Sequence, residues 1–208
     1  MAERAAILTA GLRELRLELS AEQIGALLHF VELMAKWNKT YNLTAIRDPD
    51  AMVAYHILDS LSVLGHVRGP RVLDVGAGAG LPGLPLAVCM PDCAFTLLDS
   101  NAKKTRFMRQ AALELGLRNV TVAQERVQAF QPEALFSCII SRAFAAIGDM
   151  LALTGHCLAD GGVWLAMKGK RPDAELEHLN LEYSVAYLHA PGVVGERCVV
   201  ALEKRNHG

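Results

Sequence analysis

The sequence predicts an α/β protein with a mostly parallel, doubly wound sheet and an N-terminal helical extension. Three observations support this prediction. Short apolar runs alternate with helical stretches between residues 71 and 202, as in a sheet with helices on both faces. A glycine-rich segment follows the first apolar run, and a carboxylate ends the second. Both features fall at the sheet edge where ligands of such folds bind.

The chain length of 208 residues and the hydrophobic fraction of 52 % suit a single domain. We divide this domain into an N-terminal helical part, 1–66, and a core, 67–208. Charged residues interrupt the longest apolar stretches, and no basic region followed by an apolar one opens the chain. We therefore expect no membrane span, no secretory signal and a cytoplasmic location.

The five cysteines form an odd set without the spacing of a disulfide framework or a metal site. We expect buried, reduced thiols and no bound metal. The net charge of −1 gives no overall support for nucleic-acid binding, although a neutral total can conceal a basic face.

The N-terminal part begins with two helices over residues 3–38, and Ser20 with Gln23 forms the capping box of the second. The following segment, 36–44, carries lysines, amides and two aromatic residues. It is either a helix end with packing anchors or a surface for a base or phosphate. Asp48 and Pro49 start a further helix, in which His56 is either a base or a hydrogen-bonded structural residue.

The segment 71–83 organises the rest of the chain. A strand at 72–75 leads into glycines at 76, 78, 80 and 83, where positive φ angles and close approach to a ligand are needed. The following helix N-terminus should aim unpaired N–H groups at that ligand. The G-x-G-x-G spacing after Asp74 resembles motif I of S-adenosylmethionine-dependent methyltransferases. A loose dinucleotide fingerprint through Gly78 and Gly83, or a purely structural turn, remains open.

The second strand, 95–99, ends in Asp99, which can accept hydrogen bonds from both ribose hydroxyls of an adenosine. Asn101 then caps a long helix whose cations make either a solvated face or a basic patch near the ligand. These cations are Lys103, Lys104, Arg106 and Arg109. Gly116 ends that helix.

The remaining elements complete the sheet. We expect further strands at 120–122, 136–141, 163–167, 183–189 and 198–202, the last two antiparallel, with helices at 85–90 and 146–158. In this architecture the loop after the third strand passes the adenine, which suggests backbone contacts near Val127 and Gln128. Arg142 follows the fourth strand and Lys168 the fifth, so both lie at the ligand edge.

Six motifs together resemble the RsmG family (glucose-inhibited division protein B) over nearly the whole chain. They are K-W-N-K-T-Y-N-L-T at 36–44, H-I-L-D-S-L at 56–61, D-V-G-A-G-A-G-L-P-G at 74–83, L-L-D-S at 97–100, S-R-A-F at 141–144 and M-K-G at 167–169. The resemblance implies a Rossmann-like class I methyltransferase. Its substrate would be N7 of one guanine in bacterial 16S rRNA, in the loop near the decoding site.

The resemblance also implies site residues. The cofactor, S-adenosyl-L-methionine, would contact Gly76, Leu81, Val127, Gln128 and Arg142, besides Asp74, Gly78, Gly80 and Asp99 of the motifs above. Activity or RNA binding would involve Asn42, Arg126, Arg142 and Lys168. The partner would be 16S rRNA in the small ribosomal subunit or an assembly intermediate. We expect a monomer. The segment after Arg171 matches the family only in pattern.

Guanine N7 carries a lone pair and no proton, so its methylation needs alignment and exclusion of water, without a base, a thiolate or a metal. Three other functions are weighed against it. They are a dinucleotide-dependent oxidoreductase with His56 as its proton relay, a methyltransferase acting on a protein or small metabolite, and a non-catalytic RNA-binding or assembly factor.

Overall fold

The computed structural model describes residues 2–143, 146–179 and 181–204. Its sheet has the strand order β3-β2-β1-β4-β5-β7-β6. The strands are β1 (Arg71–Val75), β2 (Ala94–Asp99), β3 (Val120–Gln124), β4 (Phe136–Arg142), β5 (Leu158–Lys168), β6 (Tyr183–Tyr187) and β7 (Cys198–Glu203). Strands β1 to β5 pair in parallel, whereas β7 is antiparallel to β5 and β6. The predicted mostly parallel sheet is confirmed.

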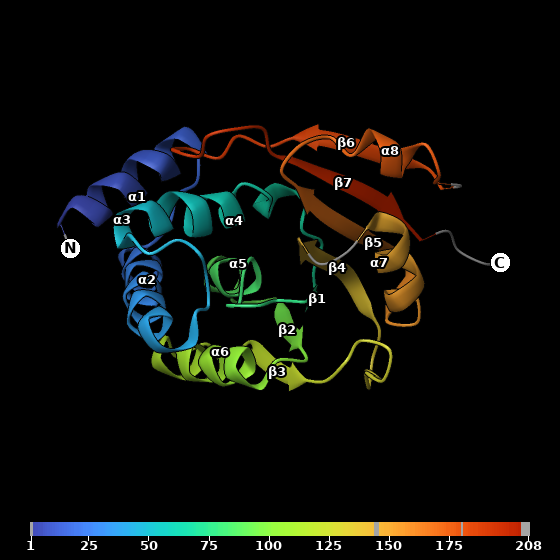
Figure 1. Cartoon of the computed structure of the whole chain (residues 1–208), viewed down its shortest axis with the longest axis horizontal. Coiled ribbons are helices and arrows are strands. Elements are labelled where there is room, and N and C mark those ends of the chain that lie inside the picture. Colours follow the sequence, from blue (N-terminus) through green and yellow to red (C-terminus); the bar gives the residue numbers. More distant parts are fainter. Residues whose placement is uncertain (1, 144–145, 180, 205–208) are drawn as a thin grey trace.

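Helices cover both faces of this sheet (Figure 1). They are α1 (Ala2–Glu14), α2 (Ala21–Tyr41), α3 (Pro49–Met52), the π-helical turn η1 (Val53–Leu58), α4 (Asp59–Leu61), the 3₁₀ turn η2 (Leu64–His66), α5 (Gly83–Cys89), α6 (Ala102–Glu114), α7 (Ile147–Thr154) and α8 (Asp173–Leu176). The N-terminal helices lie on the side of α5 and α6, and α7 with α8 lies on the other (Figure 1).

The parallel strands β1, β2, β4 and β5 are largely buried, as parallel strands between helices must be. In β1, Val72 belongs to the core beside α5, while Leu73 and Val75 belong to the core beneath α7. In β2, Phe95 belongs to the core beside α5 and Leu98 to the core beneath α7. The continuous apolar runs in the sequence therefore report two-sided burial.

The order of the strands reverses at β1. From β1 the chain continues to β2 and β3 on one side, and β4 and β5 lie on the other. In open α/β sheets a crevice forms beyond the carboxyl ends of the strands at such a point. Gly76 follows β1 and Ala143 follows β4, so these two segments border the crevice.

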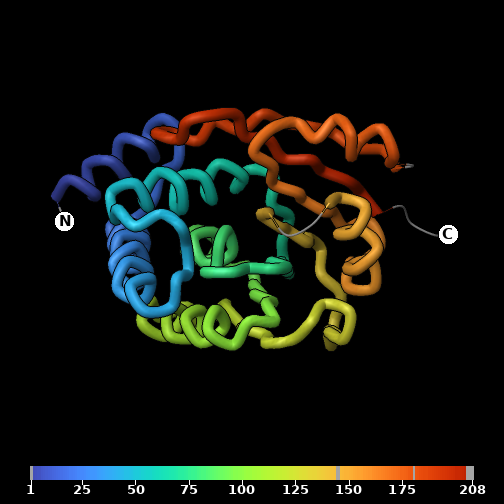
Figure 2. Tube along the Cα trace, in the orientation of Figure 1, coloured from blue at the N-terminus to red at the C-terminus, as the bar shows by residue number. Residues whose placement is uncertain are grey.

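The N-terminal helices share a core with α5 and α6. Leu27 and Phe30 of α2 pack in one cluster with Leu84 and Phe107, and the Phe30 and Phe107 ring centroids lie 6.1 Å apart. The segment between β6 and β7 also returns to α1 (Figure 2), where His189 Nε2 lies 3.0 Å from a Glu14 carboxylate oxygen. Because the N-terminal helices and the core share these contacts, we propose that the chain forms a single domain.

Several elements differ from their predicted form. The helix that begins after Asp48 continues as the π-helical turn η1 from Val53 to Leu58. The spacing of the apolar residues did not predict this turn. The helix predicted over 146–158 ends at Thr154, because the chain turns at Gly155 and the Cys157 N–H donates to Thr154 O. Helix α8 was not predicted, since four residues are too few to show a period.

We expect Gly83→Ala to lower the free energy of unfolding by about 2 kcal/mol. A Cβ at Gly83 would collide with the side chain of Leu97 and lie 2.7 Å from Asp74 Oδ2. Urea denaturation measures the change. Gly25→Ala in α2 is the matched control, because no atom lies within 4 Å of its added Cβ. That variant should gain about 0.5–1 kcal/mol. A Gly83→Ala protein as stable as wild type would contradict this packing.

Candidate active site

The glycine loop after β1 has the backbone that its sequence predicts. Gly76, Gly78 and Gly80 have φ angles of 68°, 59° and 79°, a region that residues with a Cβ rarely adopt. The loop closes where the Gly83 N–H donates to Asp74 Oδ2 at 2.8 Å. Asp74 therefore holds the loop to the end of β1.

Most N–H groups of this loop donate within the protein. The expectation of unpaired donors at the start of α5 is wrong, because the Gly83, Leu84 and Leu86 N–H groups are all engaged. Six N–H groups of the loop donate within the chain, from Gly76 and Ala77 to Leu98 O, from Gly78 to Asp99, from Gly80 and Leu81 to Ala77 O, and from Gly83 to Asp74. A dinucleotide loop offers such groups to a pyrophosphate. The closed loop disfavours a dinucleotide and suits a cofactor without phosphates.

A cavity of about 400 Å³ lies beside this loop, which we call the glycine-loop cavity. Among its lining residues are five of the predicted site residues, Gly76, Asp99, Arg126, Val127 and Gln128. The other predicted cofactor residues of the loop lie outside this lining, and their contacts stay predictions. They are Asp74, Gly78, Gly80 and Leu81.

Asp99 lines the glycine-loop cavity, and each of its carboxylate oxygens accepts one hydrogen bond from the backbone. Oδ2 accepts from the Gly78 N–H at 2.9 Å and Oδ1 from the Asn101 N–H at 2.8 Å. A carboxylate has about four acceptor sites, so two remain for the hydroxyls of a ribose. Lys104, from the basic stretch of α6, lines the same cavity, which brings one of those cations to the site.

Asp74 is fully buried beneath the loop. Burial raises the pKa of Asp74 to about 7, although the Gly83 N–H and the charge of Arg142 lower it. Its Oδ1 has no hydrogen-bond partner among the described residues. A buried acceptor without a partner is costly. A contact of this atom with a ligand stays a prediction, because Asp74 lies outside the lining of the glycine-loop cavity.

A second cavity, of about 340 Å³, lies across the ends of β4 and β5. We call it the arginine cavity because Arg142 and Arg197 both line it. Lys168 lines it too, as do Tyr55 and Asp59 from the N-terminal part. Of these five residues, the sequence predicted only Arg142 and Lys168 as site residues.

Ala143 lines both cavities, which therefore lie next to each other. Its φ of 56° places a residue with a Cβ in the left-handed region, which costs about 1–3 kcal/mol and occurs at functional sites. This conformation turns the chain sharply after β4. Arg142 consequently belongs to the arginine cavity, while Ala143 reaches the glycine-loop cavity.

Carboxylates hold the cations of the arginine cavity. Arg142 Nη1 donates to Asp59 Oδ2 at 2.9 Å, and Arg197 Nε donates to Asp59 Oδ1 at 2.9 Å. Lys168 Nζ lies 2.9 Å from both Glu175 oxygens. Partial burial alone would raise the pKa of Glu175, but hydrogen bonds from Lys168 and from the Ile147 N–H lower it. These cations are therefore oriented by the chain itself.

Asn42 lies outside the lining of both cavities. It ends α2 with a φ of 50°, and its Oδ1 accepts from Arg47 Nη2 at 3.2 Å. Its loop is fixed from within, because Asn38 Oδ1 accepts from the Thr44 N–H at 2.9 Å and Asn38 Nδ2 donates to Ile46 O. A contact of Asn42 with substrate stays a prediction.

His56 is buried and hydrogen-bonded, which favours the interpretation as a structural residue over that as a base. Nδ1 lies 3.1 Å from Tyr55 O, which only accepts, so Nδ1 carries the proton. Nε2 then accepts from the Thr44 hydroxyl at 2.9 Å. Burial and the charge of Arg142 lower the pKa of His56 to about 4. A neutral ring with both nitrogens engaged does not suit a proton relay.

Burial raises the pKa of all five cysteine thiols, which disfavours the reactive thiolate form. Burial raises the pKa of Cys138 to about 11 and that of Cys157 to about 11, so both thiols stay protonated near neutral pH. Within the described ranges no group of three or more His, Cys, Asp or Glu side chains could hold a metal ion.

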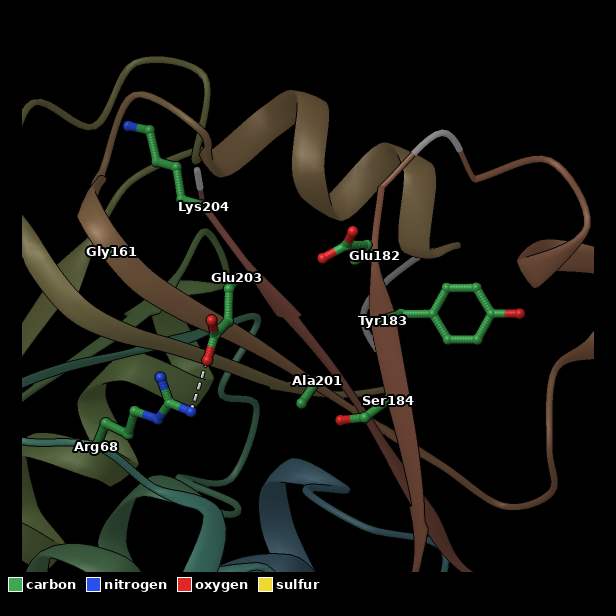
Figure 3. Close-up of a pocket in the computed structure, with 8 residues that line it drawn as sticks. All are labelled: Arg68, Gly161, Glu182, Tyr183, Ser184, Ala201, Glu203 and Lys204. Atoms are coloured by element: carbon green, nitrogen blue, oxygen red, sulfur yellow. Dashed lines mark ion pairs between the residues drawn. The ribbon is translucent and has the colours of Figure 1, made fainter. Parts of the chain in front are cut away.

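A third hollow is lined by residues from β5, from β6 and β7, and by Arg68 before β1 (Figure 3). Its charges are already paired, since Arg68 Nη2 lies 2.7 Å from Glu203 Oε1 and Lys204 Nζ donates to the carbonyls of Gly155 and Leu158. The ring of Tyr183 points away from it (Figure 3). Because it lies away from the crevice, we do not assign the reaction to it.

Comparison with known proteins decides the family. The family model described as rRNA small subunit methyltransferase G matches residues 23–197. The chain belongs to this family. It is 51 % identical over 201 residues to the ribosomal RNA small subunit methyltransferase G of Laribacter hongkongensis, covering 95 % of this chain and 97 % of that protein. The enzyme of that name from Nitrosococcus oceani is 47 % identical over 205 residues, with 97 % and 96 % coverage. The resemblance to the RsmG family is thereby confirmed.

Solved structures confirm the fold. The N-methyltransferase NodS from Bradyrhizobium japonicum, in complex with S-adenosyl-L-homocysteine, superposes with a TM-score of 0.56 at 12 % identity, covering 84 % of this chain and 99 % of that one. An O-methyltransferase from Thermotoga maritima gives a TM-score of 0.57 at 14 % identity, with 72 % and 66 % coverage. In the described part of the chain, no helix is long and apolar enough to cross a membrane.

We expect His56 to make stability depend on pH. Its folded pKa of about 4 lies below the unfolded value of about 6.5, so the unfolded state binds the proton more tightly between these values. The folded state should lose on the order of 3 kcal/mol as pH falls from 6.5 to 4, and His56→Gln should remove this loss. Urea denaturation across that range measures it, with the exposed His178→Gln as control. Parallel pH profiles for wild type and His56→Gln would contradict the assignment.

Proposed function

We propose that this protein transfers a methyl group from S-adenosyl-L-methionine to N7 of a guanine in bacterial 16S rRNA. Within the family we assign it to guanine 527 (standard rRNA numbering), in the loop near the decoding site. We further propose that it works as a monomer in the cytoplasm, on the small ribosomal subunit or an assembly intermediate.

The observation that carries the proposal is a pair of neighbouring cavities that share Ala143 in their lining. The glycine-loop cavity offers a carboxylate and a closed loop, which suits an adenosine without phosphates. The arginine cavity offers fixed cations, which suit the oxygens of a nucleotide. A methyl group passing from one cavity to the other would cross at Ala143.

Bound S-adenosyl-L-methionine would supply a methyl group already activated on a sulfonium. Asp99 would accept the ribose hydroxyls, and the backbone at Val127 and Gln128 would border the base. The remaining task of the chain is to fix the guanine in line with that methyl group and exclude water. N7 has no proton to lose, so a neutral His56 and protonated thiols are no handicap.

The cations must bind RNA without repelling the sulfonium. Asp59 offsets part of the charge of Arg142 and Arg197, and Glu175 offsets that of Lys168. Arginine commonly binds guanine O6 and N7 together, but N7 must stay open to the methyl group. We therefore expect these cations to contact O6 or a phosphate. Arg126 lines the other cavity, and we assign it to the RNA backbone.

The decisive experiment uses labelled S-adenosyl-L-methionine and small ribosomal subunits from a strain lacking this gene. Chemical cleavage at 7-methylguanosine locates the product. One new site in the loop near the decoding site is the expected result. Label elsewhere would keep a methyltransferase but reject this substrate. Cofactor binding without transfer would favour an assembly factor, and label on a protein or metabolite would favour a different acceptor.

Lys168→Ala should reduce kcat/KM for the subunit by about 10- to 100-fold, because a charge-assisted hydrogen bond to the RNA is lost. The affinity for S-adenosyl-L-methionine, measured by calorimetry, should stay within a few fold. Lys170→Ala is the matched control, since this exposed lysine lies outside both cavities. Equal losses of cofactor affinity and RNA methylation would refute the RNA-facing role of Lys168.

Asp99→Ala should impair cofactor binding more than the methylation step, the reverse of Lys168→Ala. We expect cofactor affinity to fall by roughly 10- to 100-fold through loss of the ribose contacts, with methylation partly restored at high cofactor concentration. Asp92→Ala, an exposed carboxylate before the same strand, should leave affinity unchanged. Unaltered affinity in Asp99→Ala would show that the cofactor binds elsewhere.

A further inference from the structure

One buried carboxylate joins three separated parts of the chain at the arginine cavity. Asp59, at the start of α4, is only 4 % exposed. Its two oxygens accept from different arginines, Oδ2 from Arg142 at the end of β4 and Oδ1 from Arg197 just before β7. Each donor–acceptor distance is 2.9 Å. The position of each guanidinium thus depends on the same side chain.

The π-helical turn η1 adds a second contact to this cluster. Arg142 Nη1 also donates to Tyr55 O at 3.1 Å. Such turns are rare and often occur at functional sites. Here the turn lies directly before Asp59, so that a backbone carbonyl and a carboxylate from adjacent turns engage one nitrogen of Arg142.

The contacts leave specific donors available. Among the described residues, Arg142 Nη2 and Nε and Arg197 Nη2 have no further hydrogen bond. Both arginines line the cavity. Two guanidinium groups and one carboxylate also leave a single net positive charge, which suits one phosphate or carbonyl oxygen better than a cluster of anions.

We propose that Asp59 is a positioning residue for methyl transfer, which presents Arg142 and Arg197 as a fixed pair to one acceptor oxygen of the substrate nucleotide. The proposal rests on the function proposed above and assigns Asp59 no direct contact with the reacting atoms. Loss of its charge releases both guanidiniums, and a displacement of about 1 Å can cost about 100-fold in rate.

Asp59→Asn tests the proposal, because asparagine keeps the size and one acceptor oxygen. We expect kcat for methylation of small subunits to fall by about 10- to 100-fold. The affinity for S-adenosyl-L-homocysteine should stay within about threefold. Glu203→Gln is the matched control, since it breaks an exposed carboxylate–arginine pair at the hollow of Figure 3. It should keep the wild-type kcat.

A mutant cycle separates positioning from a general loss of structure. If Asp59 acts through Arg142 and Arg197, then adding Asp59→Asn to a protein in which both arginines are already changed to Gln should lower kcat by less than about threefold. Multiplicative losses in the combined variant would overturn the proposal, as would a wild-type kcat in Asp59→Asn. If Asp59→Asn does not fold, Asp59→Glu keeps the charge but moves it. That variant should bind cofactor normally and still lose kcat, and a normal kcat would overturn the proposal.

The same assay separates a failure of the proposed methyl transfer from a failure of the role proposed for Asp59. Wild-type protein that transfers no methyl group to the subunits would reject the proposed function itself. Wild-type transfer together with unchanged transfer by Asp59→Asn would reject only the role of Asp59.

Discussion

The hydrogen bond from the Gly83 N–H to the buried Asp74 carboxylate is the constraint on which the cofactor side of the site depends. It draws the start of α5 onto the end of β1 and closes the glycine loop over the sheet. The loop's donors are then used within the protein. What remains beside it is a cavity that Asp99 lines with unused acceptor sites. A local closure thereby selects the class of cofactor.

The second constraint is the turn at Ala143. The order of the strands reverses between β1 and β4, so their ends diverge and leave a crevice. Ala143, a left-handed residue directly after β4, lines both cavities, whereas Arg142 lines only the arginine cavity. Two binding functions can then lie within a short distance of each other, as direct transfer between two bound molecules requires.

The sequence predicted the sheet, the glycine loop and five residues that line the glycine-loop cavity, because these features depend on local patterns. Gly76 and Asp99 follow strands whose apolar runs are evident. In the arginine cavity, the sequence predicted only Arg142 and Lys168 as site residues. Asp59 lay in a quoted motif without an assigned role, and Arg197 gave no local signal because its partner is 138 positions away in the chain. Contacts of that range follow from the folded topology, which no periodicity of one segment reveals.

The central claim is that one cofactor lies across the glycine-loop cavity with its sulfur at Ala143, facing the arginine cavity. A crystal structure with S-adenosyl-L-homocysteine tests it most directly. The account predicts the ribose on Asp99, the adenine near Val127 and the sulfur beside Ala143, with the Asp59 pairs retained. Adenosine bound away from Asp99, or a sulfur directed away from the arginine cavity, would contradict it.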